Sequence, residues 1–564
     1  MLPDSALEFM DWTWPQIEPH YEELASRPLT ADNVAEWLAD WTRLSRLVSE
    51  TYARHHVAIT RDTTDQEAER RYHTFLDDIY PPVQEAEQAL RQKFLDSGLA
   101  VPDFEVQTRN MRAQVELFRE ENLPLLTQER KLSAEYDKIA GAQTVEWEGE
   151  ERTIQALQPV YQDQDRDRRE RAWRLAAERQ LADREALNDL WGKFLEVRQQ
   201  LAANADCSDF REFRWRQMLR FDYTPEDCLS FHRAIEEVVV PAASRIYARR
   251  QERLGLESLR PWDLRVDPKS RPSLRPFESV EQLEGVAGDI FRRTDPQLGD
   301  YFDTLRGEGL LDLDNRKGKA PGGYCTTFHV EKRPFIFMNA VGLHQDVQTL
   351  LHEAGHAFHV FESGHLPYHQ QWTVGMEFAE VASMAMELLA APYLAAGQGG
   401  FYADPDAARA RAEHLEDALR FWPYMAVVDA FQHWVYTHPE SAADPAKCDE
   451  MWTGLWARFM PDVDWSGLEE EMVTGWQRKL HIFKYPFYYV EYGLAQLGAV
   501  QVWRNALQNQ AEAVARYRQA LALGGTVPLP DLFAAAGAKL AFDADTLGEA
   551  GALIERTLAE LDSS

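Results

Sequence analysis

The segment His352-Glu353-Ala354-Gly355-His356 places two imidazoles one helical turn apart, with a carboxylate beside them. Around it, apolar side chains recur at steps of three and four residues: Val347, Leu350, Leu351, Ala354, Phe358 and Phe361. This period predicts an amphipathic helix. At about 100° per residue, His352 and His356 fall on the face opposite the apolar stripe. The two histidines are therefore expected to point away from the core that packs the helix.

Two histidines at this spacing, with a glutamate after the first, are typical of a helix that holds a catalytic zinc ion and the base that works with it. A purely structural pair would be expected within the apolar stripe, where packing could hold both rings. We therefore predict that His352 and His356 bind zinc, one ion per chain, and that Glu353 is the base.

A catalytic zinc site needs a third protein ligand and leaves a fourth position for water. Glu362 stands where the metzincin pattern has its third ligand, but that pattern needs a glycine at position 359, and His359 is there instead. A second helix is predicted over 375–389, rich in good helix formers. Glu380 and Glu387 share one of its faces, and Glu377 lies about 60° away. Helix geometry alone does not choose among these three.

Residues 318–389 resemble the thimet oligopeptidase and oligoendopeptidase F family of zinc peptidases. The resemblance rests on a Lys-Ala-Pro-Gly-Gly-Tyr-Cys turn (Lys319 to Cys325), a strand from Pro334 to Asn339, the histidine-bearing helix, and Phe378-Ala379-Glu380-Val381-Ala382-Ser383. In that family the glutamate of the last element is the third zinc ligand, which implies this role for Glu380. Glu387 matches a further acidic position, for which we expect a supporting role next to a ligand.

A second region of similarity is the stretch 481–493, HIFKYPFYYVEYG. Pro486 suits the first turn of a helix, so His481 is predicted in the loop before it. Packing is the ordinary explanation of an aromatic cluster, but the resemblance implies that His481 and a tyrosine stabilise the transition state. Four tyrosines are candidates, the first two preferred for that role and the last two expected to bind substrate: Tyr488, Tyr492, Tyr485 and Tyr489.

The turn at Gly322, Gly323 and Tyr324, with the strand that begins at Pro334, is expected to hold a peptide backbone by edge pairing. The resemblance implies an endopeptidase that hydrolyses short, unstructured oligopeptides, in which Glu353 takes the proton of a zinc-bound water. One alternative is a zinc carboxypeptidase or dipeptidyl carboxypeptidase of similar helical bowl shape. Another is a non-catalytic zinc-containing peptide-binding protein, although such a protein would be expected to lack Glu353.

Helical signals dominate the chain, and no low-complexity linker or repeat divides its 564 residues. We predict a mostly α fold, which the resemblance makes a two-lobed helical ellipsoid around a deep substrate channel, with a small β-sheet beside the zinc helix. Residues 1–160 are expected to form an N-terminal helical lobe and 161–564 the catalytic region, within one integrated body. A short hairpin is expected around Thr144 to Ile154, turning at Glu148-Gly149-Glu150.

The composition restricts partners and location. A net charge of −33 argues against nucleic acid, which requires clustered lysine and arginine. No apolar run approaches membrane-spanning length, and the acidic N-terminus does not resemble a signal peptide. Four cysteines are widely spaced without a metal-binding pattern, as expected of free thiols in a reducing cytoplasm. We therefore expect a cytoplasmic protein with peptide substrates; its oligomeric state is not predicted.

Overall fold

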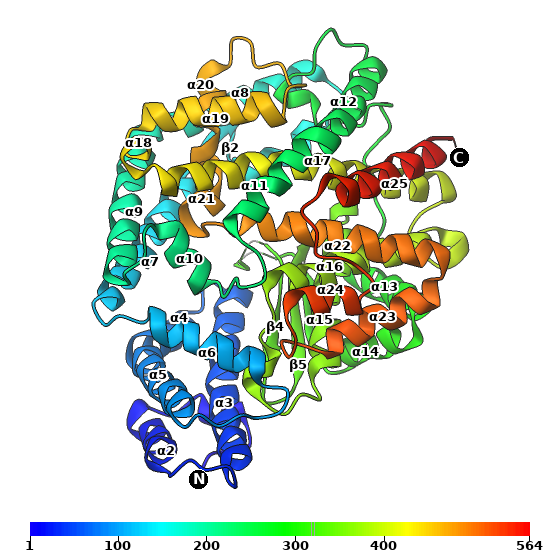
Figure 1. The fold of residues 1–564 in the computed structure, drawn as a ribbon. Coiled ribbons are helices and arrows are strands. Elements are labelled where there is room, and N and C mark those ends of the chain that lie inside the picture. Colours follow the sequence, from blue (N-terminus) through cyan, green and yellow to red (C-terminus); the bar gives the residue numbers. More distant parts are fainter. Residues whose placement is uncertain (317, 321, 564) are drawn as a thin grey trace.

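The computed structural model describes residues 1–316, 318–320 and 322–563, and it is mostly α-helical with two short sheets (Figure 1). The predicted fold class is confirmed. Pro321 of the predicted glycine-rich turn lies outside the described residues. No helix within the described ranges is long and apolar enough to cross a membrane. All four cysteines are free, as predicted.

The first helices pack around their own apolar cluster, separate from the main core. Trp37 and Trp41 of the third helix are fully buried there. The indole of Trp41 donates to the buried carboxylate of Glu87, which also accepts from Tyr21 and Ser45. These helices, blue in Figure 1, are α1 (Ala6–Phe9), α2 (Trp14–Ser26), α3 (Val34–Arg61), α4 (Gln66–Thr74), α5 (Tyr80–Asp96) and α6 (Glu105–Leu117).

Most later helices share one large apolar core. They are α7 (Asn122–Gly141), α9 (Arg184–Asn204), α10 (Phe210–Gln217), α11 (Pro225–Ala234), α12 (Val240–Leu254), α13 (Val280–Thr294), α14 (Pro296–Gly307), α15 (His344–Ser363), α16 (Met376–Ala390), α17 (Asp404–Thr437), α18 (Pro439–Ala442), α19 (Pro445–Phe459), α21 (Leu480–Lys484), α22 (Tyr489–Gln508), α23 (Gln510–Ala522), α24 (Leu529–Ala535) and α25 (Ala544–Ser563). Two further helices lie outside this core: α8 (Arg166–Leu181), which packs in a smaller cluster, and the short α20 (Glu469–Val473). The lobe boundary expected at residue 160 stays a prediction.

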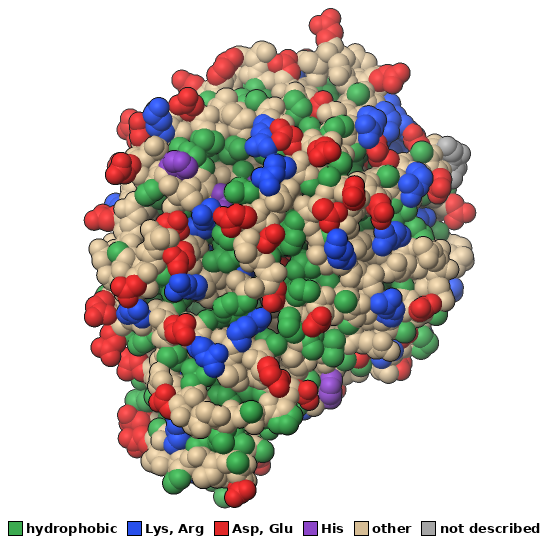
Figure 2. All heavy atoms as spheres, viewed as in Figure 1, with side chains coloured by type: hydrophobic (Ala, Val, Ile, Leu, Met, Phe, Trp, Pro, Cys, Tyr) green, Lys and Arg blue, Asp and Glu red, His purple; other side chains and the backbone are tan. Residues whose placement is uncertain are grey.

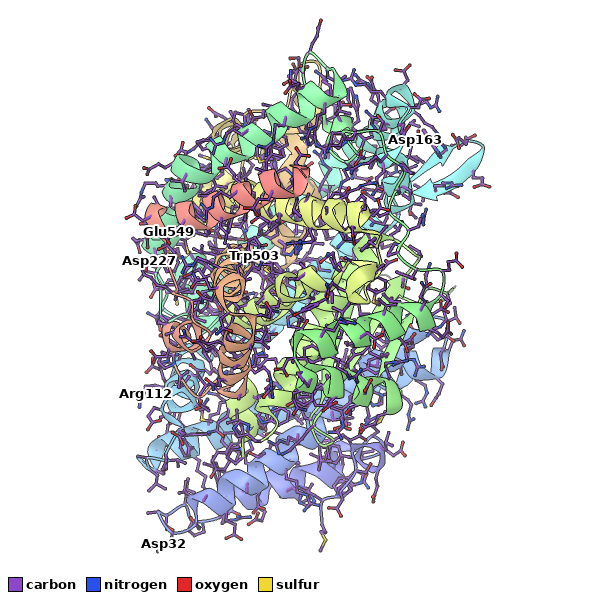
Figure 3. The ribbon with its side chains drawn as sticks, turned by 90° about the vertical axis from the view of Figure 1, so that its right-hand side faces the viewer. Asp32, Arg112, Asp163, Asp227, Trp503 and Glu549 are labelled. Carbon is purple, nitrogen blue, oxygen red and sulfur yellow. The ribbon has the colours of Figure 1, made fainter. Side chains whose placement is uncertain are left out.

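The expected hairpin is present as β1 (Thr144–Trp147) and β2 (Glu150–Thr153), paired antiparallel. Glu148 and Gly149 both have positive φ, 55° and 84°, which is the geometry of a two-residue turn that matches strand twist. The hairpin projects from the body near Asp163 (Figure 3). Trp147 fixes it by packing in a small apolar cluster that it shares with α8.

The second sheet lies against α15, as predicted, and has the strand order β3-β5-β4. Its strands are β3 (Leu311–Asp314), β4 (Tyr324–Phe328) and β5 (Arg333–Ala340). The central strand, β5, is almost wholly buried, as its apolar sequence requires. Among the described strands, β4 pairs with β5 alone, so its other side is an edge of the sheet.

A cavity of about 720 Å³ lies between the N-terminal helices and this edge strand. Its walls include Ser49 and Tyr52 of α3, Met111 of α6, and Thr326 and Thr327 of β4. The cavity therefore follows the part of β4 that has no neighbouring strand. Acidic and basic side chains are interspersed over the face of the molecule seen in Figure 2.

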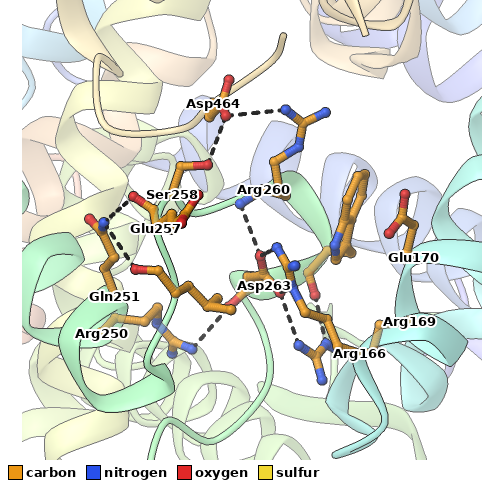
Figure 4. A network of polar contacts seen from close by, with 12 residues as sticks. Arg166, Arg169, Glu170, Arg250, Gln251, Glu257, Ser258, Arg260, Asp263 and Asp464 are labelled. Atoms are coloured by element: carbon orange, nitrogen blue, oxygen red, sulfur yellow. Dashed lines mark hydrogen bonds and ion pairs between the residues drawn. The ribbon is translucent and has the colours of Figure 1, made fainter. Parts of the chain in front are cut away.

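Asp263 joins α8 to the irregular segment that follows α12 (Figure 4). Its fully buried carboxylate accepts from Arg166 Nε and Nη2 at 3.0 and 2.8 Å, and from Arg169 Nη2 at 2.9 Å. The backbone N–H of Arg260 adds a further bond of 3.0 Å. A buried carboxylate needs such partners because burial without them penalises its charge. The network anchors the connection between α12 and α13 to α8.

Candidate active site

The histidine pair lies on α15 as its period predicts. Val347, Leu351 and Phe358 of the apolar stripe are buried in the main core. The side chains of His352 and His356 keep 25% and 20% of their surface exposed. Both rings therefore stand on the face of the helix that does not enter the core.

Glu380 of α16 meets both imidazoles. Its Oε2 lies 3.3 Å from His352 Nε2 and 3.7 Å from His356 Nε2. Ligand atoms of a tetrahedral zinc site lie roughly 3.3 to 3.6 Å apart, because each is about 2.0 to 2.2 Å from the ion. The three donors therefore fit a zinc ion with one coordination position left open. Ser383, one turn later, donates to Glu380 Oε2 at 3.1 Å.

The other glutamates point elsewhere. Glu377 accepts a hydrogen bond of 2.6 Å from Tyr223 OH and lies 3.7 Å from Arg220, so its carboxylate is turned away from the histidines. Glu362 forms an ion pair with Arg518 at 2.7 Å. Among the described residues, the histidine pair forms a possible metal cluster with Glu380 alone, in which the three donor atoms all lie within 4.8 Å of one another.

Gly355 permits the close approach of α15 and α16. A Cβ atom at this position would lie 2.5 Å from the carbonyl oxygen of Ala382 and 2.6 Å from Ser383 Cα. Both contacts are with backbone, which cannot rotate away. Any side chain at 355 would force the two helices apart.

A second layer of polar groups supports His352. Its Nδ1 lies 2.7 Å from Glu387 Oε1, as expected of an acidic residue beside a ligand, and the other Glu387 oxygen lies 2.9 Å from His414 Nε2. With its Nδ1–H donated to Glu387, His352 turns the Nε2 lone pair towards Glu380 and His356. The two histidines lower the pKa of Glu387 to about 2, although burial opposes this shift.

Glu353 is buried beside the edge strand, with 8% of its surface exposed. Burial raises the pKa of its carboxyl group to about 7. The backbone N–H of Cys325, on β4, faces this carboxylate and opposes the rise. The arrangement places a buried carboxyl group near both the edge strand and the three predicted zinc ligands.

The glycine-rich turn leads directly into that edge. Gly322 has φ of 101°, which side chains rarely adopt. A Cβ atom on Gly323 would lie 3.2 Å from Thr349 of α15, so the turn is held close to the histidine helix. The ring of Tyr324 stacks on Phe337 at 4.8 Å, and its hydroxyl is 2.6 Å from Thr60 Oγ1.

The C-terminal aromatic segment begins its long helix later than predicted. His481 belongs to the short helix α21, and α22 starts at Tyr489, so Pro486 does not begin the helix. The reason is tertiary: Phe487 has φ of 62°, outside the helical region, and its N–H donates to Gln432 Oε1 at 2.7 Å. This turn directs Tyr488 towards the site.

Tyr488 and Tyr492 are the tyrosines nearest the predicted ligands. The hydroxyl of Tyr488 donates to Glu380 Oε1 at 3.3 Å, and its ring lies 5.1 Å from that of Tyr492. His481 stacks on Tyr488 with ring centroids 6.1 Å apart. Burial lowers the pKa of His481 to about 3, so this imidazole is neutral near pH 7.

Tyr489 and Tyr485 lie differently. Tyr489 is buried, and Lys479 Nζ donates to its hydroxyl at 2.8 Å. Tyr485 is 46% exposed. The ring of His481 is 4.9 Å from Tyr489 and 6.2 Å from Tyr485, so all four tyrosines surround this histidine.

The predicted family is tested by comparison with known proteins. The profile of peptidase family M3 matches residues 160–551, which include every predicted zinc ligand and the C-terminal aromatic segment. The chain belongs to peptidase family M3. The solved structure described as PZ peptidase A with inhibitor 2 is similar to this M3 chain at a TM-score of 0.86 and 28% identity, covering 100% of this chain and 98% of its own.

Two further proteins resemble this M3 member. A putative oligoendopeptidase F from Bacillus anthracis str. Ames has a TM-score of 0.83 at 25% identity, with 100% of this chain and 98% of that chain covered. Oligopeptidase PepF of Bacillus subtilis (strain 168) is 24% identical over 309 residues, which are 53% of this chain. The match spans 43% of the length of that curated relative.

Sequence reasoning missed two functional-site contacts of this M3 chain. His414 comes from α17 and carries no motif that distinguishes it from other histidines. Ser383 stood within the quoted family motif, one turn after Glu380, and that spacing was the signal for its bond to the carboxylate.

Proposed function

We propose that this chain is a zinc-dependent endopeptidase that hydrolyses short, unfolded oligopeptides. The observation that carries the proposal is the position of Glu353, a buried carboxylate that faces the backbone N–H of Cys325 on edge strand β4 and adjoins the His352, His356 and Glu380 donors. A peptide added to that edge would bring a backbone carbonyl to the base. The M3 family profile and the M3-like solved structures support the same chemistry.

His352, His356 and Glu380 are the residues that would hold zinc. A zinc ion bound there supplies Lewis acidity and makes water acidic enough to attack near neutral pH. Glu353 takes the proton of the attacking water and gives it to the leaving amine. The elevated pKa of Glu353 suits a group that must both accept and release a proton. Glu387 keeps His352 in the tautomer that presents Nε2.

His481 and Tyr488 are proposed to stabilise the oxyanion that develops on the scissile carbonyl, with Tyr492 beside them. A neutral imidazole can donate one hydrogen bond, and burial keeps His481 neutral. Its Nδ1 finds no hydrogen-bond partner in the described part of the chain. Donors fixed in a partly dry cleft act strongly because they need little reorganisation.

Peptide binding is proposed along β4. The edge offers backbone donors and acceptors, and Thr326 and Thr327 of the same strand line the cavity of about 720 Å³. Gly322 and Gly323 would allow the substrate backbone to approach without steric conflict. The exposed Tyr485 would contact substrate, whereas the buried Tyr489 would support His481. A folded protein would not enter such a site, which restricts substrates to extended segments.

The test is mass spectrometry of the products from a library of unstructured peptides. Internal cuts, abolished by a chelator and restored by zinc, are expected. Removal of one or two residues from the C-terminus would instead indicate a carboxypeptidase or dipeptidyl carboxypeptidase. An uncut library that nevertheless binds would indicate a peptide-binding protein.

A further inference from the structure

A second group of metal-ligating side chains lies between α11 and α17. Cys228 and His232 are four residues apart on α11, and Asp429 and His433 are four residues apart on α17. On a helix this spacing places both members of a pair on one face. All four residues are buried, with no more than 3% of their surface exposed. The faces that carry them pack against each other.

This cluster is separate from the candidate active site. Fifteen residues of α17 separate Asp429 from His414, which contacts Glu387, and this corresponds to roughly 22 Å along a helix. The two donor sets share no residue. Within the described residues, Cys228, Asp429 and His433 each offer one donor atom within 4.8 Å of the others.

Several donor atoms of the cluster are unsatisfied. Asp429 Oδ1 and both ring nitrogens of His433 are buried and find no hydrogen-bond partner in the described ranges. His433 Nε2 lies 3.3 Å from Asp429 Oδ2, but it is not oriented to form a hydrogen bond. Buried polar groups without partners are rare in folded proteins. A cation bound by Asp429 and one ring nitrogen of His433 would give both side chains a partner.

The charge balance of the cluster points the same way. The ion-pair partners of Asp429 among the described residues are His232, at 2.8 Å, and His433. Among the described residues, no arginine or lysine forms an ion pair with this carboxylate. A divalent cation would compensate a buried carboxylate together with a thiolate, and sulfur with nitrogen and oxygen donors suits zinc.

We propose that Cys228, Asp429 and His433 bind a second metal ion of the zinc class, and that His232 holds the Asp429 carboxylate in place. His–carboxylate contacts of this kind orient the ligands of many metal sites. The separation of 3.3 Å between His433 Nε2 and Asp429 Oδ2 already equals that of two zinc ligands. Cys228 Sγ lies within 4.8 Å of a donor atom of each of these two residues.

The role of this ion is to hold the turn that presents Tyr488. The ring of Phe487 lies 5.1 Å from that of His433, and the Phe487 N–H donates to Gln432, the residue before His433. Phe487 has a positive φ, so its conformation depends on these tertiary contacts. An ion that fixes His433 would therefore stabilise the backbone conformation one residue before Tyr488.

Metal analysis of the purified holoenzyme tests the proposal. Two zinc ions per chain are expected in the wild type, one in His356→Ala, which loses a predicted catalytic ligand, and one in Cys228→Ser. Cys448→Ser is the matched control, because Cys448 is equally buried but donates to the carbonyl of Ala442. This control should keep two ions.

Replacement of zinc by Co²⁺ gives a readout that does not depend on activity. A cobalt–thiolate charge-transfer band is expected from the proposed site and not from the catalytic one, because the His352, His356 and Glu380 set contains no cysteine. The band is expected in the wild type, His356→Ala and Cys448→Ser, and its loss is expected in Cys228→Ser. His433→Gln, which retains the thiol, should weaken it and lower the metal content to one.

Two results would overturn the proposal. One zinc ion per chain in the wild type, together with no thiolate band, would mean that the cluster holds only protons or water. A charge-transfer band that persists in Cys228→Ser would show that a different cysteine binds the cobalt ion. Both results are independent of peptide hydrolysis, so they distinguish failure of this inference from failure of the proposed endopeptidase.

Discussion

His352 Nδ1 lies 2.7 Å from Glu387 Oε1. The imidazole that supplies one predicted zinc ligand is therefore hydrogen-bonded to a carboxylate through its other ring nitrogen. The same carboxylate reaches His414 at 2.9 Å. α16 thus contributes twice to the site, once through Glu380 and once, two turns later, through Glu387. Glu380 is predicted to bind the ion, and Glu387 orients the neighbouring ligand, His352.

Replacing Glu387 should therefore weaken zinc binding without abolishing it. Glu387→Gln is expected to lower zinc affinity about 10- to 100-fold, because His352 loses its charged partner but remains a ligand. Competition with a chelator measures the change. Glu377→Gln is the control on the same helix, since its carboxylate faces Tyr223, and it should leave zinc affinity unaltered. Equal affinities in both variants would contradict the supporting role of Glu387.

The base and the third ligand should separate by mutation. Glu353→Gln is expected to retain zinc and lose nearly all turnover, because the amide cannot accept the proton. Glu380→Gln should lose zinc affinity as well as turnover. Metal content and turnover measured on the same preparations decide the matter. Loss of metal from Glu353→Gln, with normal metal binding in Glu380→Gln, would reverse these assignments.

The tyrosines should divide according to their contacts. His481→Ala and Tyr488→Phe are expected to lower turnover by about 10²- to 10³-fold with little change in melting temperature, because the lost hydrogen bond belongs to the transition state. Tyr492→Phe tests the neighbouring hydroxyl in the same assay. Tyr485→Phe should be silent, since that ring is 46% exposed.

Tyr489→Phe should show the opposite pattern. Its hydroxyl is the partner of Lys479 Nζ, and burial lowers the pKa of that ammonium to about 8. Removing the hydroxyl is expected to reduce the melting temperature more than the turnover. Near-normal turnover in His481→Ala and in all four Tyr→Phe variants would remove this cluster from the mechanism.

Asp263 should control stability rather than catalysis. Asp263→Ala is expected to cost about 3 to 5 kcal/mol of unfolding free energy, because the Arg169 side chain, 3% exposed, would be left buried without its carboxylate. Urea unfolding measures the loss. Glu170→Gln, which removes only an exposed pair with Arg174, should cost about 0.5 kcal/mol or less.

The contribution of Asp263 should also depend on pH. Although burial opposes it, hydrogen bonds from Arg166 and Arg169 lower the folded-state pKa of Asp263 below its usual value. A group whose pKa is lower in the folded state stabilises the protein at pH values above its unfolded pKa, here about 3.9. This stabilisation is lost as the pH falls through the folded pKa. The stability difference between wild type and Asp263→Asn should therefore be full at neutral pH and shrink below about pH 4. A difference that grows on acidification would contradict this assignment.

The features of the structure that depend on local periodicity were predicted correctly from the sequence. The spacing of Val347, Leu351 and Phe358 predicted both α15 and the direction of its histidines, because helix geometry fixes which residues share a face. The choice among Glu377, Glu380 and Glu387 required the resemblance. In the structure that choice depends on Tyr223 and His414, which come from distant segments that no local pattern could reveal.

The start of α22 was predicted wrongly for the same reason. Pro486 is locally suited to begin a helix, but Phe487 is held at positive φ by a bond to Gln432 of α17. A contact across 55 residues overrides the local preference. The pairing of Cys228 and His232 with Asp429 and His433 is equally invisible in the sequence, since each pair alone is an ordinary i, i+4 spacing.

The absence of a side chain at Gly355 gives the site a fixed dimension. Because α15 and α16 meet backbone to backbone at that point, the separation of the helices that carry the histidines and Glu380 is set by backbone contact and not by the fit of adaptable side chains. Such a frame has its ligand spacing before any ion arrives and resists widening afterwards. It should therefore discriminate against larger ions such as Ca²⁺, whose oxygen ligands lie at about 2.3 to 2.6 Å and number six or more.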